Sequence, residues 1–165
     1  MNYASLKKYD VANAPGICTT LFVSGCTHHC EGCFNQDQWN FNYGNRFTAE
    51  TLKELLSYAN DNAVANICIL GGDPLDQGQD MLNMLLAIKS NVNKPIWLWT
   101  GYTFEEILID SLKTRIIEHV DVLVDGKFIL EQRDLKLKYK GSKNQRVIDV
   151  KSSLESGKVV LLDVN

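Results

Sequence analysis

The chain has 165 residues, 45% of them hydrophobic and 22% charged, and its formal net charge is −3. This length predicts one domain with a hydrophobic core over residues 1–165. No apolar run approaches the roughly 20 residues that span a bilayer, and the opening MNYASLKKYD lacks the apolar core of a signal peptide. We therefore expect a cytoplasmic protein with no membrane partner, and the negative charge argues against a nucleic-acid partner.

The predicted elements alternate between strands and helices. Residues 1–16 are predicted to be a lead-in that ends in the turn Pro15-Gly16. The β-branched and apolar run that follows, ICTTLFV, predicts a buried strand. In chain order we predict strand 17–23, loop 36–47, a helix with N-cap Thr48, strand 67–70, helix 79–90, strand 96–99, a helix capped by Thr103 and Glu106, and strand 120–124.

The last part of the chain has a looser pattern. Residues 147–150 and 159–164 are candidate strands, with a short turn of helix near Ser153 between them. For the segment 150–165, an edge hairpin, a partner-binding tail and neither of these all stay open. In the earlier helix 79–90, Leu86 is expected to face the core.

The alternation favours a mainly parallel sheet with right-handed crossovers. Four strands end in distinctive loops, SGCTHHCEGCF, GGDP, TGYT and DGKF. Barrels and open α/β sheets place their active sites at the carboxyl ends of the strands. Because four to six β/α units are too few for a closed eight-stranded barrel, we predict an α/β fold of the incomplete β/α barrel type.

Basic residues are concentrated in residues 127–146, which we call the basic segment. It holds seven Lys or Arg against two acidic residues, a local charge of +5 that leaves −8 for the rest of the chain. Such a segment is either a solvated loop or a docking surface for an acidic partner. The sequence favours neither.

Three of the five cysteines lie close together in SGCTHHCEGCFN, at Cys26, Cys30 and Cys33. In a reducing compartment, clustered cysteines indicate metal or redox chemistry rather than disulfides. A closed zinc site needs four protein ligands, and so does a fully ligated iron–sulfur cluster. Three thiolates would leave one metal ion with an open position for a substrate or cofactor. The competing interpretation is a zinc-binding loop in which His28 or His29 supplies the fourth ligand.

Other candidate residues receive structural interpretations. His28 and His29 are predicted to be exposed loop residues, and Cys68, which alternates within a strand, is predicted to be a core thiol. Trp97 and Trp99 share one face of their strand because side chains alternate with a period of two. Trp99 is expected either to border the active site or simply to pack.

The spacing of the three cysteines resembles the cluster motif of the radical S-adenosylmethionine enzymes. DVANAPGICTTLFVSGC, GGDPL, WLWTGYTFEE, VDVLVDGKF and GSKNQR resemble the small family among them that activates anaerobic (class III) ribonucleotide reductases. The resemblance extends from residue 2 to about residue 150. It implies a glycyl-radical-activating enzyme with the reductase as its protein substrate, and a partial barrel of the radical S-adenosylmethionine type.

The resemblance also implies a set of cofactor contacts. Cys26, Cys30 and Cys33 would hold a [4Fe–4S] cluster through three irons, and the fourth iron would take the amino and carboxylate groups of S-adenosylmethionine. Cys33, Gly32 and Phe34 would lie beside that cofactor, with Phe34 a candidate to pack on the adenine.

The GGDP loop resembles the glycine-glycine-acidic motif of the family. Bare backbone at Gly71 and Gly72 would let the methionine group approach, and Asp73 would accept a hydrogen bond from its ammonium. An electron from a donor such as a flavodoxin or ferredoxin would cleave the cofactor to a 5′-deoxyadenosyl radical, which would abstract hydrogen from a glycine of the reductase. No catalytic side chain beyond the cluster and cofactor is implied.

Two departures from the family pattern stand near the first predicted strand. Ala14 replaces a glycine, at a cost of about 1 kcal/mol if the turn needs a positive φ, and an arginine usual near the position of Cys18 is missing. Four alternatives stay open: an activase of another glycyl-radical enzyme, a small radical enzyme such as a deazaguanine synthase, a zinc-stabilised interaction module, and an iron–sulfur electron carrier. The electron carrier would usually show a fourth nearby cysteine.

Overall fold

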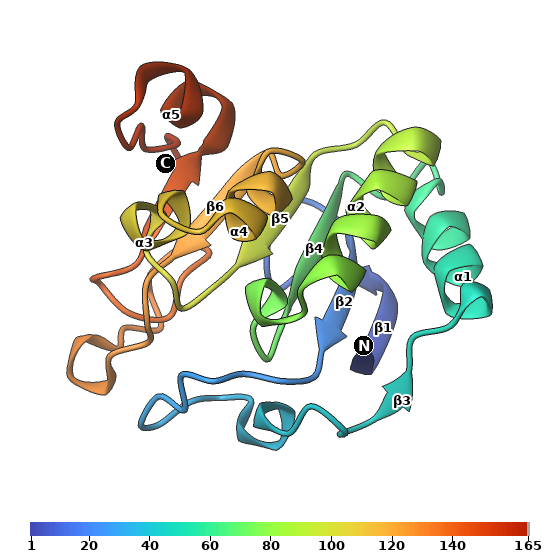
Figure 1. Ribbon diagram of the computed structural model, residues 1–165, viewed down its shortest axis with the longest axis horizontal. Helices are drawn as coiled ribbons and strands as arrows, with labels where there is room; N and C mark the ends of the chain where they lie inside the picture. The colour runs from blue at the N-terminus through green and yellow to red at the C-terminus, as the bar shows by residue number, and fades with distance from the viewer. Residues whose placement is uncertain (165) are drawn as a thin grey trace.

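The computed structural model describes residues 1–164, whose strands form one seven-stranded sheet in the order β3-β1-β2-β4-β5-β6-β7 (Figure 1). The strands are β1 (Asn2–Asp10), β2 (Cys18–Val23), β3 (Asn45–Arg46), β4 (Asn66–Gly71), β5 (Ile96–Trp99), β6 (Val122–Asp125) and β7 (Arg146–Asp149). The helices are α1 (Ala49–Ala59), α2 (Gln79–Asn91), α3 (Phe104–Leu108), α4 (Ser111–Ile117) and α5 (Val150–Ser156), with 3-10 turns η1 (Gln36–Trp39), η2 (Pro74–Asp76) and η3 (Leu130–Gln132).

The centre of the sheet is parallel and its edges are antiparallel. Strands β2, β4, β5 and β6 pair in parallel, and the connections between them contain α1, α2 and the α3–α4 pair. Strand β1 pairs antiparallel with β2, and β7 pairs antiparallel with β6. The fold is therefore mixed α/β with an open sheet, and the predicted parallel strands are confirmed at its centre.

Both ends of the chain differ from the sequence expectation. The lead-in predicted for residues 1–16 is instead the long strand β1, which hydrogen-bonds to β2 over most of its length. After β7 the chain forms α5, and the strand predicted at 159–164 is reduced to a single bridge between Leu161 and Ile148. Residue 165 lies outside the described residues. The role of the tail in partner binding stays a prediction.

The two predicted helix caps are present. The Thr48 side chain accepts a hydrogen bond from the Thr51 backbone N–H, and Thr103 forms a capping box with Glu106. These bonds satisfy N–H groups that the first turn of a helix leaves without partners. The helix predicted after Thr103 is short, because a second helix, α4, begins after its own N-cap, Asp110.

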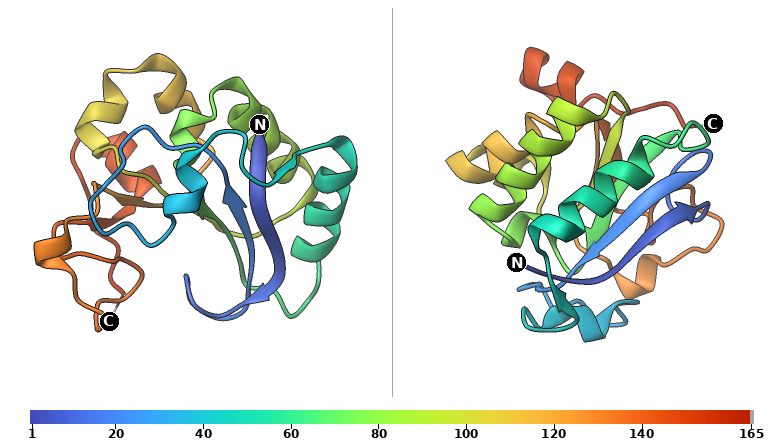
Figure 2. Two further views of the ribbon diagram at one scale, coloured as in Figure 1. Left: turned by 90° about the horizontal axis from the view of Figure 1, so that it is seen from below. Right: turned by 90° about the vertical axis from the view of Figure 1, so that its right-hand side faces the viewer.

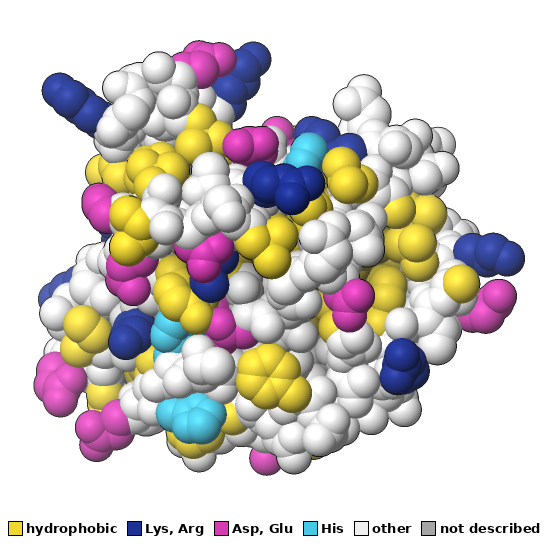
Figure 3. Space-filling view, viewed as in Figure 1, with side chains coloured by type: hydrophobic (Ala, Val, Ile, Leu, Met, Phe, Trp, Pro, Cys, Tyr) yellow, Lys and Arg dark blue, Asp and Glu magenta, His cyan; other side chains and the backbone are white. Residues whose placement is uncertain are grey.

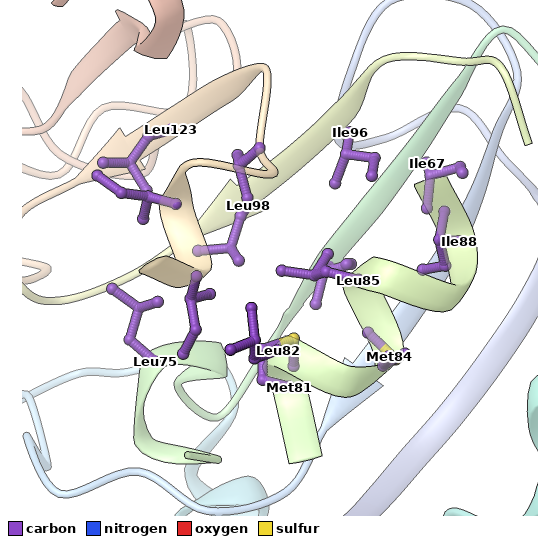
Figure 4. Packing of buried hydrophobic residues seen from close by; sticks show 14 of the residues in the cluster. Ile67, Leu75, Met81, Leu82, Met84, Leu85, Ile88, Ile96, Leu98 and Leu123 are labelled. Atoms are coloured by element: carbon purple, nitrogen blue, oxygen red, sulfur yellow. The ribbon is translucent and has the colours of Figure 1, made fainter. Parts of the chain in front are cut away.

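Helices cover one face of the sheet, where the larger hydrophobic cluster lies. Figure 4 shows side chains of β4 and β5 facing the buried side of α2, where Leu85 and Ile88 are fully buried, and Leu123 of β6 farther along the same core. Met81 and Met84 fill the same core, but Leu86 is 44% exposed and the prediction that it faces inward is wrong. Each large apolar side chain buried here contributes about 1.5–3 kcal/mol. Among residues 1–164, no helix is long and apolar enough to cross a membrane.

The opposite face of the sheet carries a smaller cluster that includes Cys18, Cys68 and Trp97. Among the described residues, those that pack against this cluster include partly buried side chains of the basic segment and the C-terminal tail, such as Tyr139 and Leu162, and none from a helix. Trp97 and Trp99 lie on this face with their rings stacked 6.0 Å apart, as the period of two predicts. Trp99 lies at the end of this face that borders the candidate site described below.

An ion-pair network holds the two ends of the basic segment together. The Arg146 guanidinium donates to the Asp125 carboxylate at 3.0 and 2.6 Å and to Glu105 at 3.1 and 2.7 Å. Asp125 is 1% exposed and also accepts from the Phe104 N–H at 2.8 Å. The hydrogen bonds from Arg146 lower the pKa of Glu105. The network thus ties the end of β6, the start of β7 and the first turn of α3 together.

Removing this guanidinium should destabilise the fold. Arg146→Gln leaves the buried Asp125 carboxylate without its cation, so we expect the free energy of unfolding to fall by about 2–3 kcal/mol in urea denaturation. Lys113→Gln, which removes a cation from the more exposed pair with Asp110, should cost less than about 1 kcal/mol. Equal losses in the two variants would contradict the role assigned to Arg146.

Candidate functional site

The four predicted loops meet at one edge of the sheet and enclose a cavity of about 450 Å³, within the usual range for small-molecule sites. It lies at the carboxyl ends of β2, β4, β5 and β6, as the sequence predicts. In Figure 1 the loop after β2, which carries the clustered cysteines, runs along the bottom of the view toward the orange basic segment. Residues from the four loops that line the cavity are Cys26, His28, Cys30, Cys33, Phe34, Gly71, Gly72, Asp73, Thr100, Gly101, Gly126 and Phe128.

The cavity contains three thiols. Cys26, Cys30 and Cys33 all line it, are partly buried, and form no disulfide. Cys18 and Cys68 are buried within the sheet, and the prediction of a core thiol at Cys68 is confirmed. The donor set therefore fits a cluster that takes three protein thiolates and keeps one iron open.

Burial disfavours the thiolate form of two of the three cavity cysteines. Burial, aided by the charges of Asp73 and Asp76, raises the pKa of Cys26 to about 11, and burial also raises the pKa of Cys30. A metal that binds here must displace these protons, because thiolates are the ligands.

Gly71 and Gly72 let two loops touch through their backbones. The Gly72 N–H donates to the Val23 carbonyl at 2.8 Å, and the Asp73 N–H donates to the Gly25 carbonyl at 2.8 Å. A Cβ at Gly71 would overlap Val23, and a Cβ at Gly72 would lie 2.5 Å from the Gly25 carbonyl oxygen. The two glycines therefore hold the GGDP loop directly against the cysteine loop, whereas their contact with a methionine group stays a prediction.

A side chain at position 72 should disrupt this packing. In Gly72→Ala the new methyl group meets backbone oxygens that cannot rotate away, so we expect a loss of about 2–3 kcal/mol in unfolding free energy. Gly78→Ala is the matched control: its Cβ would meet nothing within 4 Å, and only its φ of +65° is strained, which costs about 1 kcal/mol. Urea denaturation of both variants measures the difference, and a larger loss in Gly78→Ala would contradict the packing argument.

Asp73 is a buried hydrogen-bond acceptor for three segments. It is 1% exposed, and its carboxylate accepts from the Leu75 N–H, the Thr100 hydroxyl and the Gly101 N–H, each at 2.9 Å. Its Oδ2 also lies 2.7 Å from Nε2 of His28. Asp73 therefore joins the GGDP, TGYT and cysteine loops, and it lines the cavity as well.

The prediction that His28 is an exposed loop residue is wrong. Its side chain is only 6% exposed, because the ring reaches Asp73 and packs edge-on against Tyr102 at 4.4 Å between centroids. His29 is exposed as expected, and its ring stacks on Trp39 at 4.5 Å. Although they are adjacent in the sequence, the two histidines thus contact different neighbours.

Asp76, which no sequence pattern singled out, fastens the cysteine loop from the same side. Its carboxylate accepts from the Thr27 N–H and hydroxyl at 2.9 and 3.0 Å, and from the Tyr102 hydroxyl at 2.5 Å. Burial and the hydrogen bond to Asp76 raise the pKa of Tyr102 to about 12. In the sequence, the only signal for a role of Asp76 was its position three residues after Asp73.

The segment around the third cysteine reaches the mouth of the cavity. Phe34 lines the cavity but is 59% exposed, and its ring packs against Phe128 at 5.2 Å between centroids. Gly32 is not among the lining residues; a Cβ there would meet Leu130 at 2.8 Å. Contact of either residue with a cofactor stays a prediction.

The sequence did not indicate one wall of the cavity. Leu137, Tyr139 and Lys140 of the basic segment line it, and the Trp99 indole N–H donates to the Tyr139 carbonyl at 2.7 Å. Trp99 therefore borders the site and also anchors that wall. Ala14, where a positive φ was a concern, is buried, and the non-glycine residues with positive φ in the described chain are His29 and Tyr139.

A second set of possible ligand atoms overlaps the site. Single donor atoms of Cys26, His28, Asp73 and Asp76 lie within 4.8 Å of one another. This set omits Cys30 and Cys33, and its two carboxylates already accept hydrogen bonds from the three loops. A zinc ion there would have to replace those bonds.

Comparison with known proteins agrees with this donor set. The family described as "4Fe-4S single cluster domain" matches residues 12–148. The chain is 41% identical over 150 residues to the anaerobic ribonucleoside-triphosphate reductase-activating protein of Vibrio cholerae serotype O1, covering 88% of this chain and 96% of that protein. It is 39% identical to the protein of that name from Enterobacteria phage T4 (89% and 93% covered) and 38% identical to the one from Escherichia coli K12 (89% and 97%). The chain therefore belongs to the family of anaerobic ribonucleoside-triphosphate reductase-activating proteins.

Proposed function

We propose that this protein is a radical S-adenosylmethionine enzyme that generates the glycyl radical of anaerobic ribonucleoside-triphosphate reductase. The observation that carries the proposal is the meeting of Cys26, Cys30 and Cys33 in one cavity, without a fourth cysteine, at the carboxyl ends of parallel strands. Three thiolates leave one cluster iron open. Membership in the activating-protein family supports the reductase as the target.

In this proposal the three cysteines hold a [4Fe–4S] cluster and the rest of the cavity holds S-adenosylmethionine. When bound, the cluster would supply one electron for the reductive cleavage of S-adenosylmethionine to methionine, and the cofactor's 5′-deoxyadenosyl group would then take a hydrogen atom from one glycine of the reductase. Phe34, which lines the cavity and is exposed at its mouth, would pack on the adenine.

The side chains of the cavity position the loops and exclude water. Phe22, Leu70 and Trp99 provide an apolar wall from three neighbouring strands. Such a wall limits the water and stray hydrogen donors that would quench a radical. Gly71, Gly72 and Asp73 would face the methionine group, and Asp73 would accept from its ammonium.

The same proposal extends to the type of fold, the cellular compartment and the electron donor. We propose that the open sheet is an incomplete β/α barrel, because the described helices that pack on the sheet lie on one face and the cavity lies against strands of the other. We also propose that residues 1–165 act as one cytoplasmic domain. A flavodoxin or ferredoxin would supply the electron.

One anaerobic experiment tests the function. The protein is reconstituted with iron and sulfide, reduced, and mixed with S-adenosylmethionine with and without the reductase. We expect 5′-deoxyadenosine in both mixtures and a glycyl-radical signal in electron paramagnetic resonance only when the reductase is present. A colourless zinc protein, or a cluster that leaves the cofactor intact, would overturn the proposal. A radical formed faster on a different glycyl-radical enzyme would reassign the target.

A further inference from the structure

We propose that the basic segment is a preformed docking surface for an acidic, extended stretch of the reductase that carries the target glycine. This inference rests on the proposed function, because it concerns how a protein substrate reaches the cavity. It is carried by three observations: the segment is fixed in place, six of its seven cations form no ion pair within the described residues, and it forms one wall of the cavity.

The basic segment is anchored rather than freely solvated. The Gln145 side chain accepts from the N–H groups of Gly141 and Ser142 at 2.8 and 3.2 Å and donates to the Gly126 carbonyl at 2.9 Å. The buried Ser142 hydroxyl accepts from the Ile129 N–H at 3.2 Å. Together with the bond from Trp99 to Tyr139 and the ion pairs of Arg146, these contacts fix both ends and the middle of the segment. A fixed surface loses little conformational entropy when it binds.

Over residues 136–139 of the segment, alternate residues face the solvent and the cavity. Leu137 and Tyr139 line the cavity, whereas Lys136 and Lys138 are exposed. The cations therefore lie along the rim of the cavity. A chain that inserts its glycine into the cavity has to pass beside them.

These cations are available to a partner. In the part of the chain that the structure describes, Arg146 is the only cation of the segment in an ion pair, and Lys140 is held by the Gln145 carbonyl at 2.9 Å. Lys127, Lys136 and Lys138 form no ion pair there and are exposed, as is Lys143. Elsewhere the charges are mixed: on the face in Figure 3, dark blue and magenta side chains are scattered among one another. Unpaired cations on one rim steer an acidic partner toward it.

Exposed apolar side chains lie beside the cations. Leu135 is 80% exposed, and the exposed ring of Phe34 lies 5.4 Å from the Arg133 guanidinium carbon, in the cation–π arrangement. Leu130 completes this group and approaches Gly32 of the cysteine loop. The views from below and from the side in Figure 2 place the orange segment outside the helical layer. Aromatic and arginine side chains of this kind dominate binding energy at interfaces, so the partner should carry an apolar side chain among its acidic residues.

The test measures binding of the purified reductase to the reconstituted enzyme under anaerobic conditions at low and high salt. The double variant Lys136→Glu and Lys138→Glu should weaken the affinity at least tenfold at low salt and reduce its dependence on salt. The matched control, Lys53→Glu and Lys89→Glu, makes the same charge change on α1 and α2 and should stay within twofold of wild type. Equal affinity of wild type and the rim variant, or equal loss in both double variants, overturns the inference.

A parallel measurement separates this inference from the proposed function. Cleavage of S-adenosylmethionine without reductase is followed on the same preparations. If wild type does not cleave the cofactor, the proposed function fails whatever the affinities; if it does and the rim variant still binds normally, only the docking surface fails. Should the rim variant lose iron or helix content, Lys127→Glu with Lys143→Glu replaces it. Loss of binding to a duplex oligonucleotide, with reductase binding unchanged, would show a nucleic-acid surface instead and overturn the inference.

Discussion

Replacing Cys26, Cys30 or Cys33 by alanine is expected to abolish cleavage of S-adenosylmethionine, with at least a hundredfold loss of 5′-deoxyadenosine formation. Each variant keeps two cavity thiols, and no other cysteine can move in, because Cys18 and Cys68 are buried within the sheet. A cluster held by two thiolates loses iron readily, since the ligand bonds themselves hold it in place. Iron content and the visible absorbance of the reconstituted protein should fall together with activity.

Cys68→Ala is the matched control for these variants. It removes a thiol from the sheet without touching the cavity, so iron content and cofactor cleavage should stay within about twofold of wild type, and the loss of a small buried side chain should cost about 1–2 kcal/mol of stability. Equal loss of activity in all four variants would contradict the ligand assignment.

The cysteine series also separates the cluster from a zinc site. A zinc ion at the second set of ligand atoms would use Cys26, His28, Asp73 and Asp76, whose donor atoms lie within 4.8 Å of one another. On that alternative, Cys30→Ala would bind its metal as well as wild type does. On the cluster assignment, Cys30→Ala loses its metal as Cys26→Ala does. A metal analysis of the two variants therefore decides between the cluster and this zinc site.

The sequence was most informative where its signals are local. The parallel strands at the centre of the sheet, the caps at Thr48 and Thr103, and the placement of four loops at one sheet edge follow from periodicity, capping chemistry and the geometry of parallel strands. The spacing of the cysteines likewise predicted that their thiols would meet. Each of these features depends on neighbours within a few residues or on a rule of topology, so it could be derived without coordinates.

The features that could not be predicted depend on contacts between distant residues. His28 is buried because it meets Asp73, 45 residues away, and Asp76 is important because Thr27 and Tyr102 come to it. The sequence of β1 is too polar to predict a strand by itself, and the strand forms because it hydrogen-bonds to β2. The wall formed by the basic segment depends on the pairing of β6 with β7. None of these contacts leaves a spacing pattern in the sequence.

Asp73→Ala is expected to lower the free energy of unfolding by about 3–5 kcal/mol, because it leaves several buried donors without an acceptor. The N–H groups of Leu75 and Gly101 and the Thr100 hydroxyl all donate to this carboxylate, and His28 loses its partner as well. Three loops around the cavity are therefore released together. Anaerobic urea denaturation measures the loss, and cofactor cleavage should fall at least tenfold.

Two further variants show whether the effect comes from the buried acceptor. Asp73→Asn keeps one oxygen but points an amide N–H₂ at donors that need an acceptor, so we expect a smaller loss of about 1–3 kcal/mol. Asp80→Ala removes a carboxylate that is also paired, to the N-terminal amino group, but whose side chain is 63% exposed, and it should cost less than about 1 kcal/mol. If Asp73→Ala were no more destabilising than Asp80→Ala, Asp73 would not hold the loops together. If instead the alanine and asparagine variants were both as stable as wild type but both lost affinity for S-adenosylmethionine, the carboxylate would serve the cofactor rather than the fold.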